Sequence, residues 1–323
     1  MNIVDRWNTD DKWIIKTTIC KSCKYNITPM KCEKYSNISS EILLGKTRCP
    51  YYKMENNIIM ANIVGIVVGD ILEKQDVSSS FINQNIKSKW SKDIDIILNI
   101  ISEIRKVTFT INNIKDNLYS EINKSKTILE DRESNILLEH RIFLSLFPIS
   151  VYLYKKQKNI KDRFYIIDNI IEQLHCKWLN KIECYLLIEF IIQLLKKDTL
   201  EQAYRKAYDN VTFYNKISPS LLERLSKDFI IQFSVQKVNL DTPIKDILIL
   251  GFSCLFQTKN YGDAVLKAIN LQSNIRLLGQ IVGGLAGILY SLDGIPKEWV
   301  DKIDNNLIVF DLATSLYRFY IRD

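Results

Sequence analysis

Four cysteines near the start of the chain have the residue type and the spacing of a metal site. They follow the pattern C-x2-C-x8-C-x16-C in a polar, turn-rich segment. Four thiolates can hold one zinc ion tetrahedrally, and a close CxxC pair lets a single turn supply two of the ligands. Because so short a segment cannot bury much apolar surface, we expect a structural metal that stabilises its fold. The predicted ligands are Cys20, Cys23, Cys32 and Cys49.

The cysteine pattern leaves both the metal and the role of the segment open. An iron–sulfur cluster uses the same thiolate ligands as zinc, and four reduced cysteines without a metal are a further alternative. Lysines interleaved with tyrosines in the segment are a possible nucleic-acid surface. We expect solvated surface instead, because no helix follows the cysteines as it does in zinc-containing DNA readers. Cys176, Cys184 and Cys254 fall in helical patterns and are expected to be ordinary thiols.

The composition is that of a folded protein without a secretory or membrane segment. The chain has 323 residues, of which 47% are hydrophobic, enough for a sizeable core. Its net charge of +7 is spread over lysines with acids between them, which favours solubility over nucleic-acid binding. No signal-peptide core is present, and no uninterrupted apolar run reaches the roughly 18 residues of a membrane span. Together with seven cysteines, an odd number, this predicts a cytoplasmic protein.

Helical periodicity dominates the chain from Ile58 onward. Isoleucines and leucines recur at helical spacing over residues 93–107, and this apolar stripe is expected to face the core. The segments 135–154 and 178–195 are apolar enough to be central helices. His140 lies in one of these helical patterns and is expected to be a surface or capping residue.

Helix starts and the placing of glycine and proline complete the prediction of the fold. A capping box begins at Thr199, and Ser218 and Thr242 each precede a proline as an N-cap does. Glycines and prolines are too few and too dispersed for a sandwich or barrel. We therefore predict an all-α protein, with one large helical domain at residues 58–323 after a Cys-rich extension at residues 1–57.

Three glycines at four-residue spacing, Gly279, Gly283 and Gly287, line one face of a predicted helix. Without side chains on that face, a neighbouring backbone can approach closely. Ile295 and Pro296 then end the helix. The pattern predicts a tightly packed partner helix against the glycine face.

The stretch 260–299 resembles the C-terminal signature of the ADP-ribosylglycohydrolase family, eAv..AvnlGgDtDT...i.GalaGa.yG...IP..W. Residues 263–270 match its first part, and residues 283–287 with Ile295-Pro296 and Trp299 match its second. Two weaker matches follow in the family's chain order: Gly65-Ile66-Val67-Val68-Gly69-Asp70 resembles the opening motif, and Ser91-Lys92-Asp93-Ile94 resembles its Thr-Asp-Asp-Thr. The resemblance extends from residue 58 to the C-terminus and implies a helical domain of this family's type.

The resemblance also implies where an active site would lie and how it has changed. Members of the family cleave ADP-ribose from proteins or small molecules with paired magnesium ions held by threonine and aspartate. Residues 274–277 fall on the family's Asp-Thr-Asp-Thr, so Arg276 replaces an acid, as Lys92 does in the other motif. The resemblance thus implies relic site positions at Asp93, Asn274, Arg276 and Lys92, of which Asp93, Asn274 and Arg276 would bind a ligand. We expect no magnesium there, because cations repel it, and we expect Arg276 or Lys92 to pair with Asp93.

These observations favour a catalytically inactive ADP-ribosylglycohydrolase-like protein. Its expected role is a binding module for ADP-ribose, for an ADP-ribosylated target or for a protein partner. The first alternative is a diverged hydrolase that removes ADP-ribose with Asp93 or Glu73 as acid or base. The second is nucleic-acid binding through the Cys-rich extension. The alternative without a function at the relic site is that Arg276 faces solvent and Asp93 is an N-cap or surface acid.

Overall fold

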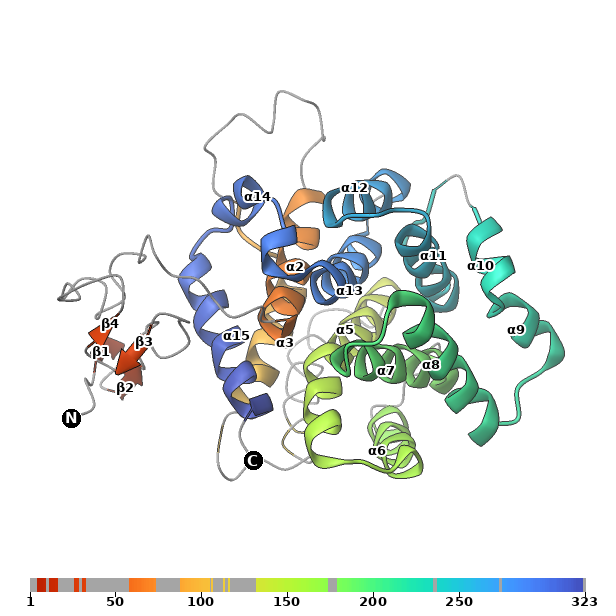
Figure 1. Cartoon of the computed structure of the whole chain (residues 1–323), viewed down its shortest axis with the longest axis horizontal. Helices are drawn as coiled ribbons and strands as arrows, with labels where there is room; N and C mark the ends of the chain where they lie inside the picture. The colour runs from red at the N-terminus through yellow and green to blue at the C-terminus, as the bar shows by residue number, and fades with distance from the viewer. Residues whose placement is uncertain are drawn as a thin grey trace. The chain divides into compact units, whose positions relative to one another are not determined.

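The chain divides into two compact units, Met1–Asn57 and Ile58–Asp323, which we describe separately (Figure 1). Four strands make up the described part of the first unit. The described residues of the computed structural model are 5–9, 12–16, 26–28, 31–32, 58–73, 88–104, 106, 113, 116, 132–173, 179–234, 237–272 and 275–321.

The N-terminal unit contains two small antiparallel sheets, which we did not predict from the sequence. Strand β1 (Asp5–Thr9) pairs with β2 (Lys12–Lys16), and β3 (Asn26–Thr28) pairs with β4 (Lys31–Cys32). Three of the four predicted metal ligands, at positions 20, 23 and 49, lie outside the described residues, and the fourth is placed only by its strand. The four-cysteine metal site therefore stays a prediction.

The regular secondary structure in the described part of the second unit is helical apart from two isolated β-bridges, in agreement with the predicted all-α fold. They are α2 (Ile58–Glu73), α3 (Lys92–Ile104), α5 (Arg132–Lys156), α6 (Ile160–Gln173), α7 (Lys181–Leu195), α8 (Leu200–Tyr214), α9 (Pro219–Arg224), α10 (Lys227–Gln232), α11 (Ile244–Phe256), α12 (Tyr261–Leu271), α13 (Leu277–Gly294), α14 (Lys297–Asp301) and α15 (Asn306–Ile321).

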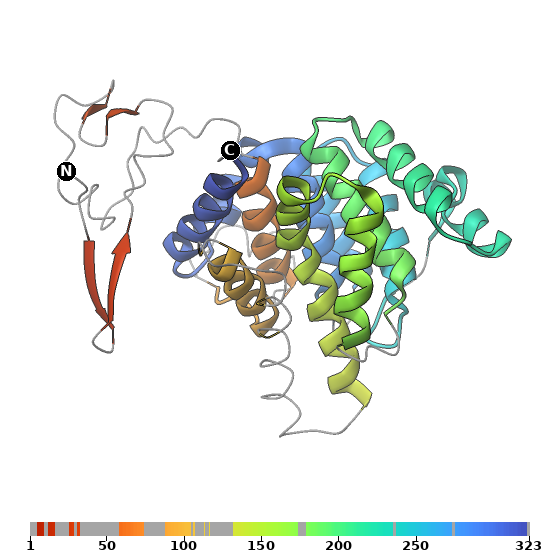
Figure 2. The ribbon, with the colours of Figure 1, turned by 90° about the horizontal axis from the view of Figure 1, so that it is seen from below.

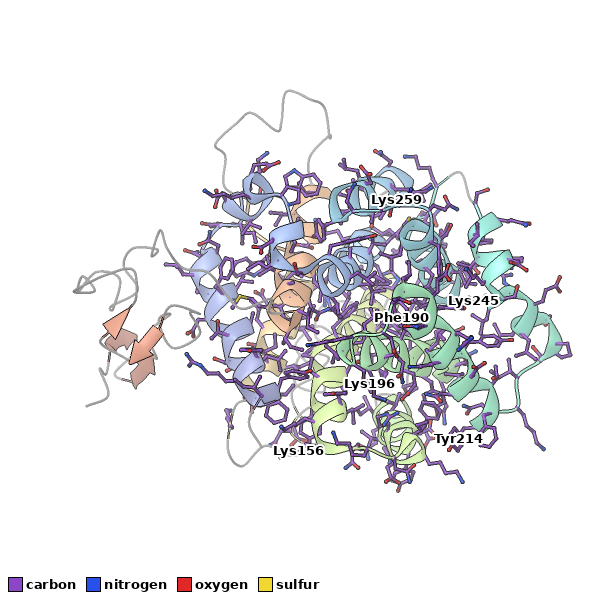
Figure 3. All side chains as sticks on the ribbon, in the orientation of Figure 1. Lys156, Phe190, Lys196, Tyr214, Lys245 and Lys259 are labelled. Atoms are coloured by element: carbon purple, nitrogen blue, oxygen red, sulfur yellow. The ribbon has the colours of Figure 1, made fainter. Side chains whose placement is uncertain are left out.

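Helices α2 and α13 lie side by side at the centre of this unit (Figures 1 and 2). Helices α11 and α12 pack on α13, α15 packs on α2 and α3, and α7 packs on α5 and α8. Phe190 lies in the interior with edge contacts to Tyr204 and Phe252, while Lys156 and Lys259 lie at the exposed surface (Figure 3). The core is thus built around a central helix pair that the other helices cover.

Apolar patterning explains why these segments are buried helices. Every residue of α2 from position 59 to 72 is buried, so this helix has no solvent face. Helix α3 is amphipathic and buries its isoleucines, including Ile94, Ile97 and Ile101, which confirms the predicted stripe. Two segments, Ile136–Lys156 and Leu277–Gly294, are long and apolar enough to cross a membrane. Most of each is buried inside the fold, as in the core helices of many proteins.

The crossing of α2 and α13 is the tightest contact between helices in the described part of the chain. A Cβ atom at Gly283 would overlap the carbonyl oxygen of Gly65, and one at Gly279 would lie 2.9 Å from the carbonyl oxygen of Gly69. Asn62 Nδ2 donates to the Gly284 carbonyl at 3.0 Å across the same crossing. The predicted close approach on the glycine face is confirmed, and its partner is the glycine-bearing face of α2.

Local capping fixes most of the helix starts that the sequence indicates. Thr199 and Gln202 form the predicted capping box, and Ser218 caps α9 with proline at its first turn. The prediction at Thr242 was wrong. Helix α11 begins at Ile244 after Pro243, and the Thr242 hydroxyl accepts instead from the Asn239 backbone N–H, closing a turn before the helix.

Burial makes Glu183 in the first turn of α7 sensitive to pH. Its side chain is almost fully buried, and burial raises the pKa of its carboxyl from 4.5 to about 7, against the opposing effect of Lys245. Between these values the unfolded chain has released the proton while the folded chain still holds it. The free energy of unfolding should therefore fall as the pH rises from about 4.5 to about 7.

Glu183→Gln is expected to remove this part of the pH dependence, because glutamine stays neutral at every pH. At about pH 8 the variant should be more stable than the unchanged protein by an amount on the order of 3 kcal/mol at most. Urea unfolding at about pH 5 and about pH 8 measures the difference. Glu201→Gln, at an exposed position, is the control and should leave the dependence unchanged. If the free energy of unfolding changed equally with pH in the unchanged protein and in Glu183→Gln, the pH dependence could not be assigned to Glu183.

Candidate functional site

Asp70 is the centre of a buried polar cluster at the C-terminal part of α2. Its side chain is fully buried. One carboxylate oxygen accepts the Ser91 backbone N–H at 2.7 Å, and the other accepts the Ser91 hydroxyl at 2.5 Å and Gln280 Nε2 at 2.9 Å. Both oxygens are therefore engaged by groups of the protein itself.

A guanidinium group adds a positive charge to this cluster. Arg276 is the N-cap residue of α13, and its Nε lies 3.8 Å from Asp70 Oδ1. About a third of the Arg276 side chain is exposed, at 34%. The start of a helix carries partial positive charge, so a cation there needs a nearby anion, and Asp70 supplies it. Arg276 can therefore contact both the buried carboxylate and the solvent.

The pKa of Asp70 is raised, chiefly because burial penalises its charged form. Hydrogen bonds from Ser91 and the charge of Arg276 act in the opposite direction, and the nearby Asp93 raises the pKa further. Removing the Arg276 charge should thus raise the pKa of Asp70 still more. The guanidinium helps to keep this carboxyl ionised.

Asp93 forms a second ion pair beside the first. Arg141 Nε on α5 lies 2.7 Å from Asp93 Oδ1 in the first turn of α3, and both side chains are mostly buried. The neighbouring His140 is also buried, and burial lowers the pKa of its imidazole from 6.5 to about 4, although the charge of Asp93 raises it. His140 is therefore neutral at neutral pH, and its Nε2 has no hydrogen-bond partner within the described part of the chain. The expected surface or capping role of His140 was wrong, because α5 places it in the core.

The structure brings Asp93 and Arg276 into one region but gives them other partners than we expected. We predicted that Arg276 or Lys92 pairs with Asp93, whereas Asp93 pairs with Arg141 and Arg276 with Asp70. The reason is the glycine crossing, which holds α2 directly against α13. Lys92 is exposed at the start of α3, and position 274 lies outside the described residues.

Several residues of the cluster were not among those predicted. Asp70 and Ser91 were recognised as motif positions but not as site residues, His140 was expected to be a surface or capping residue, and Arg141 and Gln280 were not singled out. A signal for Asp70 was present, because it is the one acid in the apolar run 58–72. An ionised group in such a run must be buried and must have partners. No comparable signal marks Arg141 or Gln280.

The arranged side chains are a poor match for a pair of magnesium ions. Magnesium requires near-octahedral oxygen ligands, usually with carboxylates and retained waters. Within the described ranges, no three histidine, cysteine, aspartate or glutamate side chains come together as a metal site would need. Both oxygens of Asp70 accept hydrogen bonds from the protein, and Oδ1 of Asp93 is paired with Arg141, so a cation would have to displace these contacts. The charges of the two acids and the two arginines balance, and the group of the cluster that reaches the solvent as a cation is the Arg276 guanidinium.

Comparisons with known proteins agree with this architecture. Residues 180–322 match the family model of ADP-ribosylglycohydrolase. A solved structure titled ADP-ribosylglycohydrolase-related protein complex superposes with a TM-score of 0.63 at 16% sequence identity, covering 82% of this chain and 99% of that one. At this identity the likeness shows the shared fold.

Sequence relatives align over shorter regions. An ADP-ribosylarginine hydrolase Tri1 of Pseudomonas putida is 32% identical over 74 residues, which is 23% of this chain and 20% of the relative. The Tri1 protein of Serratia proteamaculans is 33% identical over 72 residues, 22% and 20% of the two chains. An uncharacterized protein of Archaeoglobus fulgidus is 23% identical over 139 residues, 41% and 42%. The alignments thus span less than half the length of these relatives. The C-terminal part of the chain, residues 180–322, is thus similar to the ADP-ribosylglycohydrolase family, and the helical unit shares its fold with a solved structure related to that family.

Proposed function

We propose that this protein binds an ADP-ribose-containing ligand, free or attached to a protein, without magnesium-dependent hydrolysis. The observation that supports this is the internal neutralisation of both acidic positions, Asp70 by Arg276 and Asp93 by Arg141. Relatives that act on ADP-ribosylarginine indicate the ligand class. The pairing of both acids with arginines, and the partly exposed Arg276 guanidinium, favour ligand binding over metal-assisted chemistry.

Electrostatics decides against a magnesium ion beside Arg276. Two unit charges about 4 Å apart interact by about 4 kcal/mol at an effective dielectric of about 20, and the repulsion of a divalent ion is twice as large. Asp70 already has three hydrogen-bond donors and the guanidinium around it. A metal would have to displace these contacts while it is repelled by the cation, so its binding should be weak.

The same positive charge suits the diphosphate of ADP-ribose. Arginine binds phosphate oxygens through charge-assisted hydrogen bonds, often in pairs. Arg276 is partly exposed, and its Nε lies 3.8 Å from Asp70 Oδ1, so its guanidinium lies between the buried carboxylate and the solvent from which a ligand would come. Arg276 is therefore the residue that we expect to contact the ligand.

Titration with ADP-ribose in the presence of a chelator tests the proposal. The unchanged protein should bind, and Arg276→Ala should weaken binding about tenfold, because a hydrogen bond to a charged group contributes about 1.5–3 kcal/mol. Lys259→Ala removes one exposed positive charge elsewhere and should leave the affinity unchanged. Equal affinity in Arg276→Ala and the unchanged protein would contradict the proposal, as would tight, stoichiometric binding of magnesium.

The hydrolase alternative predicts a different result with the same preparations. Peptides bearing ADP-ribosylated arginine or serine would be cleaved, and Asp93→Ala or Asp93→Asn would abolish turnover. The metal content of the purified protein separately tests the predicted four-cysteine site.

A further inference from the structure

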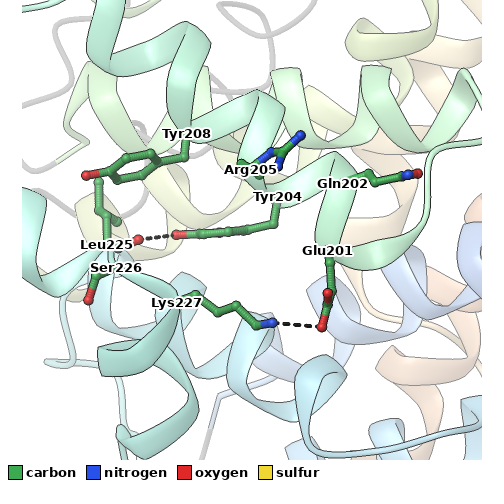
Figure 4. Close-up of a pocket in the computed structure, with 8 residues that line it drawn as sticks. All are labelled: Glu201, Gln202, Tyr204, Arg205, Tyr208, Leu225, Ser226 and Lys227. Carbon is green, nitrogen blue, oxygen red and sulfur yellow. Dashed lines mark hydrogen bonds and ion pairs between the residues drawn. The ribbon is translucent and has the colours of Figure 1, made fainter.

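A pocket between α8 and the turn that joins α9 to α10 has no role in the proposed function. Its volume is about 490 Å³, within the range of about 300–1,000 Å³ usual for small-molecule sites. Four lining residues, Glu201, Tyr204, Arg205 and Tyr208, recur at helical spacing along one face of α8. The opposite wall is the turn between α9 and α10. The lining residues are Glu201, Gln202, Tyr204, Arg205, Tyr208, Leu225, Ser226 and Lys227 (Figure 4).

Two contacts hold the walls of this pocket together. The Tyr204 hydroxyl donates to the Leu225 carbonyl at 2.7 Å, and Lys227 Nζ lies 2.7 Å from Glu201 Oε1. Tyr204 itself is buried and contacts the rings of Phe190 and Phe252, so it ties the pocket to the core. The pocket is therefore formed before any ligand arrives.

The charges in the pocket leave one cation uncompensated. Lys227 and Glu201 neutralise each other, whereas Arg205 is exposed and makes no ion pair with any residue that the structure describes. In Figure 4 the Arg205 guanidinium and the Tyr208 ring lie on the same side of the Tyr204 ring, opposite to Lys227. The half-buried Tyr208 ring and the Arg205 guanidinium thus line the same pocket from positions three residues apart on α8.

We propose that this pocket binds a small organic anion with a flat unsaturated ring. The Arg205 guanidinium would hold the anionic group, since it forms forked hydrogen bonds to carboxylate and phosphate. The Tyr208 ring, three residues further along the helix, would stack on the ring of the ligand. The Glu201 carboxylate should repel the bound anion only weakly, because its charge is compensated by the ion pair with Lys227.

Phenyl phosphate is the probe that tests the site. Isothermal titration of the full chain should show saturable binding, and Arg205→Ala should weaken it about tenfold, the loss expected for one charge-assisted hydrogen bond. Tyr208→Leu should weaken the binding of phenyl phosphate by about fivefold, because stacking of aromatic rings contributes about 0.5–1.5 kcal/mol. The affinity for cyclohexyl phosphate, which has no aromatic ring, should stay unchanged. Arg205 is exposed and Tyr208 is half-buried, and leucine keeps an apolar side chain at position 208, so both variants should fold.

Lys206→Ala is the matched control, because Lys206 is the adjacent cation on α8 but pairs with Asp198 outside the pocket. It should change the affinity for phenyl phosphate by less than about twofold. No saturable binding, equal binding by Arg205→Ala, or an equal loss in Lys206→Ala would overturn the proposal. Each of these results is independent of Arg276 and of ADP-ribose binding.

Discussion

Gly283→Ala is expected to destabilise the helical unit by about 3 kcal/mol or more, the upper range of overpacking in a core. The added methyl group would overlap the Gly65 carbonyl oxygen, which belongs to backbone and cannot rotate away. Helices α2 and α13 would have to separate along their length. Alanine ordinarily stabilises a helix interior by about 1 kcal/mol relative to glycine, so a loss here has the opposite sign to propensity.

Thermal and urea unfolding measure this loss, which should lower Tm by an amount on the order of 10 °C for a unit of this size. Gly262→Ala is the matched control in the first turn of α12. A Cβ atom there would meet its nearest atoms at 3.5 Å or more, which is ordinary contact. The control should be neutral or slightly stabilising. If both alanine variants were equally stable, the helix crossing would be wider than the structure shows.

Arg163→Met should cost about 3–5 kcal/mol, because it leaves a buried carboxylate without its cation. Arg163 forms a forked pair with Glu189, with Nε to Oε1 at 2.7 Å and Nη2 to Oε2 at 2.8 Å, and both side chains are almost fully buried. Its Nη1 also donates to the carbonyls of Gln157 and Lys158 at the end of α5. The arginine thus joins α6, α7 and the turn after α5.

A double variant separates the cost of the lone charge from the value of the pair. Glu189→Gln removes the charge but keeps an oxygen for Asn210 Nδ2, which donates to Glu189 at 3.0 Å. Arg163→Met with Glu189→Gln should therefore recover most of the stability that Arg163→Met loses. Urea unfolding of the two single variants and the double variant gives the coupling free energy between Arg163 and Glu189. Additive losses would show that the two side chains act independently.

The helical fold could be predicted because its evidence is local in the sequence. The apolar stripe of α3 and the capping box at Thr199 are both found where periodicity and cap residues indicate. Helix ends were less well placed: the predicted segment 178–195 begins at Lys181, after the N-cap Asn180. Thr242 shows the limit of such signals, since its hydroxyl is used by a turn before the helix.

The site was only half predictable, because its contacts join residues far apart in the chain. The motifs pointed to Asp93 and Arg276, which do lie in one region, but their charge partners come from other helices. Arg141 is 48 residues from Asp93, and Gln280 is 210 residues from Asp70. Which acid faces which arginine depends on the packing of α2, α3, α5 and α13, and no local pattern records that packing.

The pairing of α2 with α13 sets an order of events during synthesis of the protein. Asn62 contacts Gly284 across 222 residues, so α2 leaves the ribosome long before its partner exists. At roughly 5–20 residues per second, the delay is on the order of tens of seconds. During that time residues 59–72, all buried in the finished fold, are an uncovered apolar segment. The nascent chain should therefore depend on chaperones until its C-terminal helices emerge, and a chain that stops before α13 cannot complete its core.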